Sequence, residues 1–367
     1  MKPTLSPIYD VIVVGGGPGG SVAAKICAKE GLHTVILEKR KLPREKVCSG
    51  MVMGPWANDI IEEEFGAIPR HVLVAPHYLS GHMIHLPGCH PRIIGQRTPL
   101  AWRRDLDHWM NLQAKKAGAT IMDRAKVVHV AQEESSCRVT VEGPEDQRVL
   151  RGLYVIGADG AASRVRKSLF PALKVRYSTP LRECYPGAVD LAKDYIHWFF
   201  PKSAPRPRFD LLHKGNSFVI EGSGIPALRE EINTILTAQG FDMETKPLWR
   251  DGCTMPQLHS ALVSGAFSPA AGNVLLIGDA ACLVFPITFE GIGAALKSGL
   301  MAAQAIFESL RSKKEAAPLY LNALKPVITK VGQLFSLQRE LEDHVRKGPD
   351  ALADALKGAY EETLHVK

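Results

Sequence analysis

Short apolar runs, glycine clusters and helix-like stretches follow one another along the chain. Asp10 to Val14 is an apolar run rich in β-branched residues, which predicts a buried strand. A glycine cluster comes next, and the small residues from about Pro18 to Glu30 predict a helix. Thr34 to Leu37 is a second apolar run, which ends at Glu38. These segments predict a β-α-β unit, in which two parallel strands are joined by a right-handed crossover.

Two later apolar runs also end in glycine motifs. Leu153 to Ile156 leads into Gly-Ala-Asp-Gly, and Asn273 to Ile277 leads into Gly-Asp-Ala-Ala. Between residues 171 and 265 strand-like runs alternate with turns, and from Gly291 onward the pattern is mainly helical. Because the strands that end in glycine motifs are far apart in the sequence, we expect one nucleotide-binding domain assembled from separated segments, with a second domain inserted. Other periodic segments predict helices at Arg104–Ala117 and Pro226–Gln239, and strands at Thr120–Val130, Ile196–Phe200 and Ser217–Ile220.

Length and composition narrow the class of protein. At roughly 150 residues per domain, 367 residues predict two domains. The hydrophobic share of 46% excludes a disordered chain, and no run of about 18 apolar residues predicts a spanning helix. The first residues lack a secretory signal, and the seven cysteines are dispersed without a Cys-x-x-Cys pair. We therefore expect a cytoplasmic protein with no disulfide framework and, since no metal-binding histidine spacing occurs, no metal site.

The net charge of +7 is concentrated in one segment. Arg166 to Lys214 contains ten basic and four acidic residues. Such an excess could attract phosphates or the anionic inner face of a membrane, or it could be an ordinary solvated surface. Peripheral membrane association is therefore one expectation, and no nucleic-acid partner is predicted.

The first glycine cluster has the spacing of a dinucleotide-binding loop. Gly15, Gly17 and Gly20 form Gly-x-Gly-x-x-Gly between a strand and a helix, and Glu38 follows 23 residues after Gly15. Gly15 permits a tight turn, Gly17 lets the backbone approach a diphosphate, and Gly20 lets helix and strand pack closely. The helix N-terminus then presents N–H groups to the diphosphate. We expect Glu38 to accept hydrogen bonds from the adenosine ribose.

The motif that follows Asn273–Ile277 favours FAD over NAD. Asp279 at a strand end could bind a ribityl hydroxyl, and the small residues near it would let backbone pass close to a flat ring. The helix that begins near Gly291 would point its N-terminus at that ring and stabilise negative charge on the reduced flavin. The two motifs together predict non-covalently bound FAD.

These segments together resemble the fingerprints of flavoproteins with the para-hydroxybenzoate hydroxylase fold. The third fingerprint is Gly157-Ala-Asp159-Gly, and Arg166 is similar to the arginine that follows it in that fold. Arg103 is similar to the arginine near the flavin ribityl and phosphate groups. The resemblance, over roughly residues 9 to 310, implies a mixed α/β fold: a Rossmann-like FAD-binding domain with a parallel sheet, and an inserted substrate domain on an antiparallel sheet. The corresponding boundaries are residues 1–75, 97–170 and 266–310 for FAD, 76–96 and 171–265 for the substrate, and 311–367 for a C-terminal helical segment.

Three further stretches resemble the geranylgeranyl reductase family within that fold. Pro43 to Gly50 resembles its Pro-x-x-Lys-x-Cys-x-Gly stretch, and Tyr195 to Pro201 its aromatic motif. Residues 286–292 resemble its Pro-Ile-Thr-Gly-Glu-Gly-Ile loop, although Cys282, Phe285 and Phe289 replace Gly, Asn and Gly of the family pattern. The resemblance implies reduction of isoprenoid double bonds. The two large rings at 285 and 289 would reshape the substrate space.

The candidate site residues fall into two groups, and several have a second interpretation. Cys48 could tune the flavin, donate a proton or be a buried thiol, and Lys46 could bind phosphate or be a surface lysine. The aromatic residues could line an apolar tunnel or be plain core, and strand alternation places His197 on the solvent side, opposite Trp198. The predicted substrate-pocket residues are Tyr195, Trp198, Phe200, Phe285 and Phe289. The predicted cofactor-binding residues are Gly15, Gly17, Pro18, Gly19, Gly20, Glu38, Lys39, Lys46, Cys48, Arg103, Asp159, Gly278, Asp279, Pro286, Gly291, Ile292 and Gly293.

Three functions are open on the sequence alone. The preferred one is an FAD-dependent oxidoreductase in which flavin N5 transfers hydride to a double bond of a small apolar, isoprenoid-like substrate. Only one dinucleotide fold is visible, so NAD(P)H or another donor would bind transiently. The alternatives are a flavin monooxygenase or halogenase-like enzyme acting on an aromatic substrate, and a non-catalytic flavin-bound scaffold. The sequence does not predict the oligomeric state.

Overall fold

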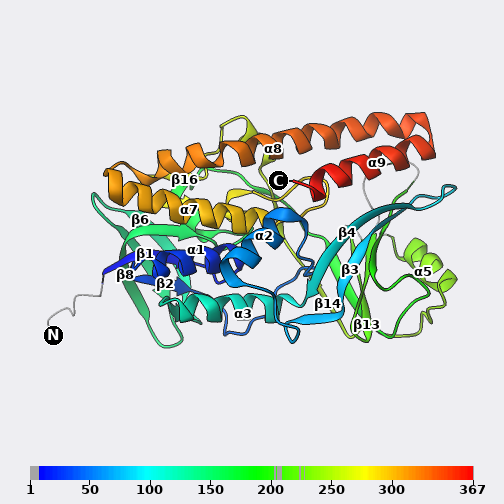
Figure 1. Ribbon diagram of the computed structural model, residues 1–367, viewed down its shortest axis with the longest axis horizontal. Coiled ribbons are helices and arrows are strands. Elements are labelled where there is room, and N and C mark those ends of the chain that lie inside the picture. The colour runs from blue at the N-terminus through cyan, green and yellow to red at the C-terminus, as the bar shows by residue number, and fades with distance from the viewer. Residues whose placement is uncertain (1–7, 202–203, 205–208, 223–224, 227, 367) are drawn as a thin grey trace.

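A computed structural model shows two β-sheets side by side, with helices along one long edge of the molecule (Figure 1). It describes residues 8–201, 204, 209–222, 225–226 and 228–366. Within these residues no helix is both long and apolar enough to cross a membrane. The mixed α/β class predicted from the sequence is confirmed, since one sheet is built on parallel strands and the other is largely antiparallel.

The first sheet is the one that contains the β-α-β unit. Its central strands run in the order β16-β17-β8-β1-β2-β5, and β1 pairs in parallel with both β2 and β8. Strands β6 and β7 extend β8 as an antiparallel meander. The strands are β1 (Ile8–Val14), β2 (Thr34–Leu37), β5 (Thr120–Met122), β6 (Lys126–Gln132), β7 (Cys137–Glu142), β8 (Gln147–Gly157), β16 (Ala270–Ala271) and β17 (Val274–Leu276).

Helices with small residues pack closely on this sheet. α1 contacts both α3 and α7, and a Cβ atom added at Gly299 of α7 would lie 2.4 Å from the Gly19 carbonyl oxygen. The two helix backbones therefore meet without intervening side chains. The helices are α1 (Pro18–Lys29), α2 (Gly54–Phe65), α3 (Arg103–Lys116), α4 (Arg164–Leu169), α6 (His259–Val263), the 3₁₀ turn η1 (Gly278–Ala281) and α7 (Ile292–Ser312).

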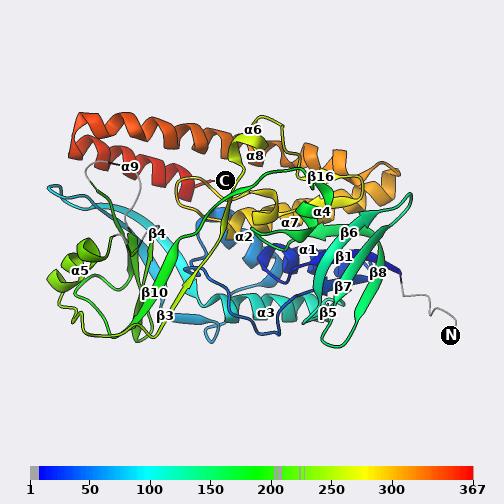
Figure 2. The same cartoon turned by 180° about the vertical axis from the view of Figure 1, so that it is seen from behind.

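The second sheet has the order β14-β10-β13-β12-β11-β3-β4, and a small β15-β9 pair lies apart from it. β11 pairs in parallel with β3, while the other pairs are antiparallel. Helix α5 lies at the far end of this sheet (Figure 2). The elements are β3 (Leu73–His85), β4 (Arg92–Ala101), β9 (Arg176–Ser178), β10 (Leu181–Pro186), β11 (Tyr195–Phe199), β12 (Phe209–Lys214), β13 (Ser217–Gly222), α5 (Arg229–Ala238), β14 (Trp249–Gly252) and β15 (Met255–Gln257).

The C-terminal helices join the two halves. α8 (Ala316–His344) contacts β16 and β17 of the first sheet, and η2 (Val345–Lys347) turns the chain into α9 (Pro349–Leu364). α9 packs against β3 and β4, so that Leu352, Leu356 and Tyr360 share one apolar core with Trp198 and Phe200. This long segment therefore covers the region between the sheets (Figure 1).

Several sequence predictions need correction. Thr120–Val130 is not one strand, because a turn with Arg124 at φ +52° separates β5 from β6. His197 does not face solvent: it is 1% exposed, and its ring nitrogens contact His85 and the Ala192 carbonyl. The reason is that the second face of this sheet is covered by its own apolar core beneath α5.

The basic segment is also not one surface patch. Arg166, Arg182 and Lys214 are buried and bind backbone carbonyls inside the protein. Lys202, Arg206 and Arg208 lie outside the described residues. Charge counted along the sequence therefore overstates the positive charge of the surface.

Candidate functional site

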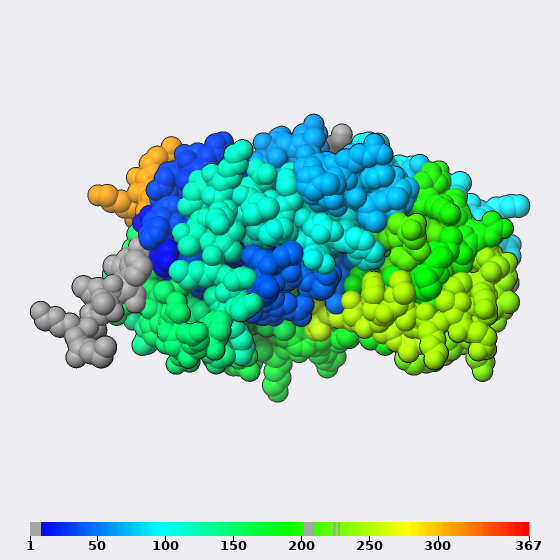
Figure 3. All heavy atoms as spheres, turned by 90° about the horizontal axis from the view of Figure 1, so that it is seen from below, coloured from blue at the N-terminus to red at the C-terminus, as the bar shows by residue number. Residues whose placement is uncertain are grey.

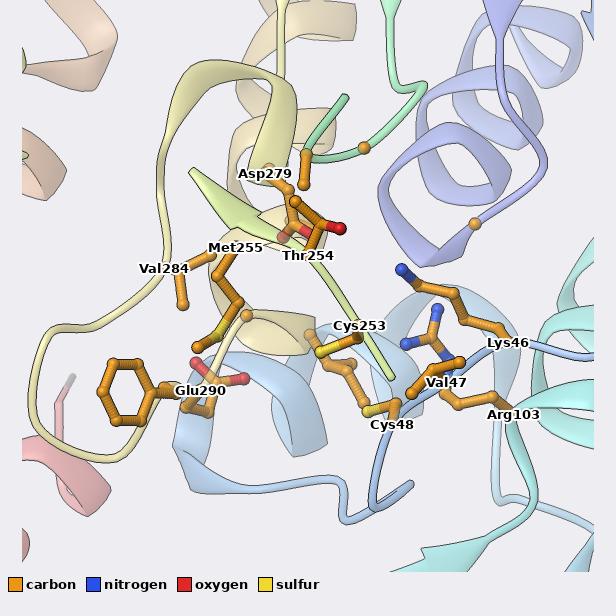
Figure 4. A pocket seen from close by; sticks show the side chains of 18 of the residues that line it. Lys46, Val47, Cys48, Arg103, Cys253, Thr254, Met255, Asp279, Val284 and Glu290 are labelled. Atoms are coloured by element: carbon orange, nitrogen blue, oxygen red, sulfur yellow. The ribbon is translucent and has the colours of Figure 1, made fainter. Parts of the chain in front are cut away.

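One cavity of about 890 Å³ extends from the glycine loop of the first sheet to the second sheet. Its lining includes Gly15 and Gly17 at one end, Asp279 and Cys48 along its length, and Trp198 at the other end. In Figure 4, Lys46, Cys48 and Arg103 lie on one side, Asp279 and Glu290 lie on the other, and the Cys253–Met255 segment passes between them. Side chains from separated parts of the sequence thus surround one space.

The glycine loop has the geometry that its spacing predicts. Gly15 has φ +111°, and a Cβ atom added at Gly20 would lie 2.0 Å from the Gly15 carbonyl oxygen. At Gly17 an added Cβ would instead have the guanidinium of Arg44 at 3.6 Å and that of Arg103 at 4.0 Å. The loop, the N-terminus of α1 and two guanidinium groups therefore form a cradle that fits a diphosphate.

Glu38 lies at the edge of this cradle and is buried. Its carboxylate accepts hydrogen bonds from the Gly16 backbone N–H (3.1 Å), the Arg40 backbone N–H (3.0 Å) and the Arg44 Nε (2.9 Å). Arg44 also contacts Asp107, which holds Arg103 through two hydrogen bonds of 2.7 and 2.9 Å. This chain of ion pairs fixes both guanidinium groups before any ligand binds.

Arg44 and Asp107 of this network were not predicted as site residues from the sequence. Arg44 follows Pro43 in the Pro43–Gly50 stretch, close to Lys46 and Cys48 in the sequence. That proximity could have identified Arg44 as a site residue. Asn111 was also missed: its side-chain amide donates to the Gly16 carbonyl (2.8 Å) and so supports the loop from α3.

The Gly157–Gly160 segment reaches the cavity, and the Asp159 carboxylate there is held by three hydrogen bonds from α4 and the residue before it. It accepts hydrogen bonds from the Ser163 hydroxyl (2.6 Å) and from the backbone N–H groups of Arg164 (2.6 Å) and Val165 (3.1 Å). Asp159 therefore orders the first turn of α4 and lines the cavity, and its role in binding the cofactor stays a prediction.

The start of α7 differs from the sequence expectation. Gly291 and Ile292 line the cavity, whereas Gly293 packs toward Trp56 and Ala57 of α2. The Glu290 carboxylate accepts a 2.5 Å hydrogen bond from the Gly293 N–H, and burial raises the pKa of Glu290 to about 7. Part of the N-terminal N–H array that we expected to face a reduced flavin is thus bound by the protein's own side chain.

The aromatic pocket predicted from the sequence is only partly present. Trp198 and Phe289 line the cavity. Phe200 and Phe285 are buried elsewhere, against Tyr360 and Trp56 respectively, and Tyr195 lies outside the lining. Trp198 and Phe200 belong to one apolar core, but Phe200 lies one residue beyond β11 and does not line the cavity.

Other aromatic rings replace the missing ones. Phe335 of α8 and Tyr360 of α9 line the cavity, and the Tyr360 ring is 5.3 Å from that of Trp198 in an edge-to-face arrangement. The helical C-terminal segment had no motif in the sequence, and only the fold brings its rings to this site.

The remaining predicted cofactor residues lie along the same cavity. Cys48 is half-buried, and its Sγ accepts a 3.4 Å hydrogen bond from the Gly50 N–H. Figure 3, seen from below, shows the N-terminal segment (blue) in contact with the segment around residue 250 (yellow-green), and both segments contribute residues to the cavity lining. The other predicted residues that line the cavity are Pro18, Gly19, Lys39, Lys46, Gly278 and Pro286.

Comparisons with known proteins agree with this geometry. Residues 8–179 match the model of the FAD binding domain family. The chain is 29% identical to the geranylgeranyl diphosphate reductase of Rhodobacter capsulatus over 91% of this chain and 84% of that protein. It is 25% identical to the digeranylgeranylglycerophospholipid reductase of Methanocaldococcus jannaschii over 84% and 79% of the respective chains.

A solved structure shares the fold over nearly the whole chain. It is a geranylgeranyl bacteriochlorophyll reductase-like protein of Thermoplasma acidophilum, with a TM-score of 0.79, 24% identity, and coverage of 97% of this chain and 96% of that one. The glycine loop, the cradle beside it and these likenesses lead to one conclusion. The chain contains an FAD-binding domain and is an FAD-dependent oxidoreductase, related at 25–29% identity to proteins named geranylgeranyl reductases.

Proposed function

We propose that this protein reduces carbon–carbon double bonds of an apolar, isoprenoid-like substrate. The observation that carries the proposal is the single cavity, which joins the diphosphate cradle of the first sheet to the apolar surface of Trp198, Phe335 and Leu341. A flat cofactor held at the first sheet would then have its reactive ring beside a space that suits a hydrocarbon chain. The names of the relatives support the same class of substrate.

Each part of the cavity has a proposed task. Arg44, Arg103 and Lys46 would bind the diphosphate of FAD, Glu38 the ribose and Asp279 the ribityl chain. Bound FAD in its reduced form supplies hydride to one carbon of the double bond. The protein orients the two partners, excludes water and provides the proton for the other carbon. Cys48, which lines the cavity between cradle and second sheet, remains a candidate for a residue that contacts the ring.

The electron donor and the site of action are further parts of the proposal. NAD(P)H, or another donor, would bind transiently and reduce FAD. A cytoplasmic protein that binds the inner face of the membrane would reach lipid-like substrates. Several of the basic residues that suggested this association are buried. Vesicle co-sedimentation with anionic and neutral lipids would test that association directly.

Anaerobic reoxidation tests the proposed reaction. The FAD-bound protein is reduced with dithionite under argon and mixed with geranylgeranyl diphosphate, while the flavin absorbance is followed. A reductase reoxidises its flavin and yields a product with fewer double bonds; the fully saturated phytanyl diphosphate is the control and should leave the flavin reduced. A monooxygenase would instead need oxygen, and a flavin that no physiological donor reduces would indicate a scaffold.

A further inference from the structure

One cross-strand row of the second sheet contains two acidic side chains that line the cavity, Asp210 and Glu221. Backbone pairing places Trp198 opposite Asp210, Asp210 opposite Glu221, and Glu221 opposite Arg182. Arg182 lies opposite Asp251 on the next strand. Directly opposite residues of paired strands share a face, so these five side chains form one row across β11, β12, β13, β10 and β14. Trp198, Asp210 and Glu221 all line the cavity.

Asp210 and Glu221 are neighbours with like charge when both are ionised. Side chains directly opposite in an antiparallel pair have Cβ atoms roughly 5 Å apart, and like charges at that distance repel. Arg182 does not bridge them, because its guanidinium binds Asp251 through two hydrogen bonds of 2.9 and 2.8 Å and also donates to the Cys48 carbonyl. The hydrogen bonds of the Arg182 guanidinium therefore go to Asp251 and to the Cys48 carbonyl.

The surroundings favour a protonated pair. Burial and the Glu221 carboxylate raise the pKa of Asp210 well above its ordinary value, and burial raises the pKa of Glu221. Asp251 acts on Glu221 in the same direction, whereas Arg182 and Lys214 act in the opposite one. Burial itself lowers the pKa of Lys214 to about 7. The directions of both pKa shifts therefore favour the protonated form of this pair.

A hydroxyl group near this pair lacks a partner among the described residues. Tyr360 of α9 is 1% exposed and lines the same cavity, and its hydroxyl oxygen is buried without a hydrogen bond. The charge of Asp210 adds to burial in raising the pKa of this hydroxyl, which places Tyr360 within electrostatic reach of Asp210. An unsatisfied hydroxyl is costly in a sealed core. Beside a cavity it is the kind of group that a substrate, a water or a carboxyl group completes.

Resting on the function proposed above, we propose that Asp210 and Glu221 share one proton and donate it to the substrate carbon that does not receive hydride. The carboxyl O–H bond breaks and a C–H bond forms. The other new C–H bond takes its hydrogen and both electrons from reduced FAD, so the flavin is oxidised and the alkene is reduced. The pair is left with one additional negative charge and takes its next proton from water.

The first test measures the shared proton without any turnover. Infrared spectra of the FAD-bound protein should contain the carbonyl band of a protonated carboxylic acid near neutral pH. Glu290 also contributes such a band, so the signal is the part that is lost in the double variant Asp210→Asn/Glu221→Gln. Asp210→Asn or Glu221→Gln alone leaves one carboxyl group without a charged neighbour, which lowers the pKa of that group. In either single variant the band should therefore disappear at lower pH than in wild type. The Lys214 side chain has no carboxyl group and cannot produce this signal.

The second test is the anaerobic reoxidation of reduced protein by geranylgeranyl diphosphate. The double variant should reoxidise about 10²-fold more slowly, the size of a lost general acid, with FAD occupancy unchanged. The wild-type rate should fall as the pH rises through the pKa of the pair, and this fall should be absent in the double variant. Glu145→Gln, on an exposed turn, is the control for removal of one carboxylate and should behave like wild type.

The outcomes separate this proposal from the function on which it rests. If no component of the carbonyl band is lost in the double variant, the shared proton is refuted. If the component is lost but the variant reoxidises at the wild-type rate, the pair is not the proton donor. If wild type does not react with any prenyl probe while the infrared result holds, the proposed reaction fails and the protonated pair remains.

Discussion

Two residues in the loop between η1 and α7 occupy backbone conformations that favour glycine. Cys282 and Phe289 have φ values of +59° and +53°. The loop pattern of the geranylgeranyl reductase family, given above, has glycine at both positions. Glycine is the residue that adopts a left-handed backbone without steric cost. A residue with a Cβ atom costs roughly 1–2 kcal/mol there. Hydrogen bonds hold the loop in this shape: the Phe289 N–H donates to the Phe285 carbonyl (3.0 Å), and the Phe285 N–H to the Glu290 carbonyl (2.9 Å).

Gly17→Val is expected to abolish FAD binding without unfolding the protein. The added side chain would enter the space between the loop and the guanidinium groups of Arg44 and Arg103, where the diphosphate would lie. Gly95→Val is the matched control, because an added Cβ at Gly95 meets no atom within 4 Å. Flavin content after purification, with circular dichroism of both variants, measures the effect. Full occupancy in Gly17→Val would show that the diphosphate lies elsewhere.

Glu290→Gln should change how stability depends on pH. Burial raises the pKa of Glu290 from its ordinary 4.5 to about 7. The protonated form therefore stabilises the fold; this contribution is complete below about pH 4.5 and is lost as the pH rises through about 7. At about 1.4 kcal/mol per pKa unit, wild type should lose about 3 kcal/mol relative to the Gln variant over that interval. Urea unfolding at pH 4.5, 6 and 8 with matched flavin content checks this, and parallel pH profiles would contradict it.

At the scale of elements, the predictable part of the fold is the part with local rules. The β-α-β unit was predicted because Gly15, Gly17 and Gly20 have the spacing of a tight strand–turn–helix connection, and because a strand-like run precedes them and a helix-like run follows them. The long helix α8 and helix α9 were predicted as helical, but their position was not, because an apolar helix face does not encode which sheet it covers. For the same reason Tyr360 and Phe335 could not be assigned to the cavity, and Asp210 and Glu221 became neighbours only through strand register.

Leu356→Ala tests how far α9 supports the second sheet. Leu356 is fully buried in the core that α9 shares with β3 and β11, so its truncation should lower the free energy of unfolding by about 2–5 kcal/mol. Leu310→Ala is the control, because Leu310 is 42% exposed on α7. Urea denaturation followed by tryptophan fluorescence measures both. Equal midpoints in the two variants would mean that α9 is not part of the cooperative unit.

At the scale of the whole molecule, the site exists only where three parts meet. The first sheet supplies the glycine loop and η1, the second sheet supplies Trp198, Asp210 and Glu221, and the C-terminal helices supply Phe335 and Tyr360. A charged cradle at one end and aromatic rings at the other suit a substrate that is held by its apolar body beside a polar cofactor. An acidic pair that lines the cavity is compatible with such a substrate only when it keeps a proton, because an ionised carboxylate needs hydration.

Phe289→Gly should enlarge the cavity and shift its preference toward longer or bulkier prenyl substrates. The side chain of Phe289 is 40% exposed and lines the cavity at the loop before α7, so its removal widens the cavity there. Lys313→Gly is the matched control: Lys313 also has a positive φ (+56°) but lies at the end of α7, outside the lining. Both variants lose left-handed strain, so both should be as stable as wild type or more stable by about 1–2 kcal/mol. Rates of anaerobic reoxidation by geranyl, farnesyl and geranylgeranyl diphosphate should change their order of preference only in Phe289→Gly. If the three rates keep the wild-type ratios while FAD stays bound, the aromatic ring at 289 does not shape the substrate space, and the length limit must lie with Trp198 and the C-terminal helices.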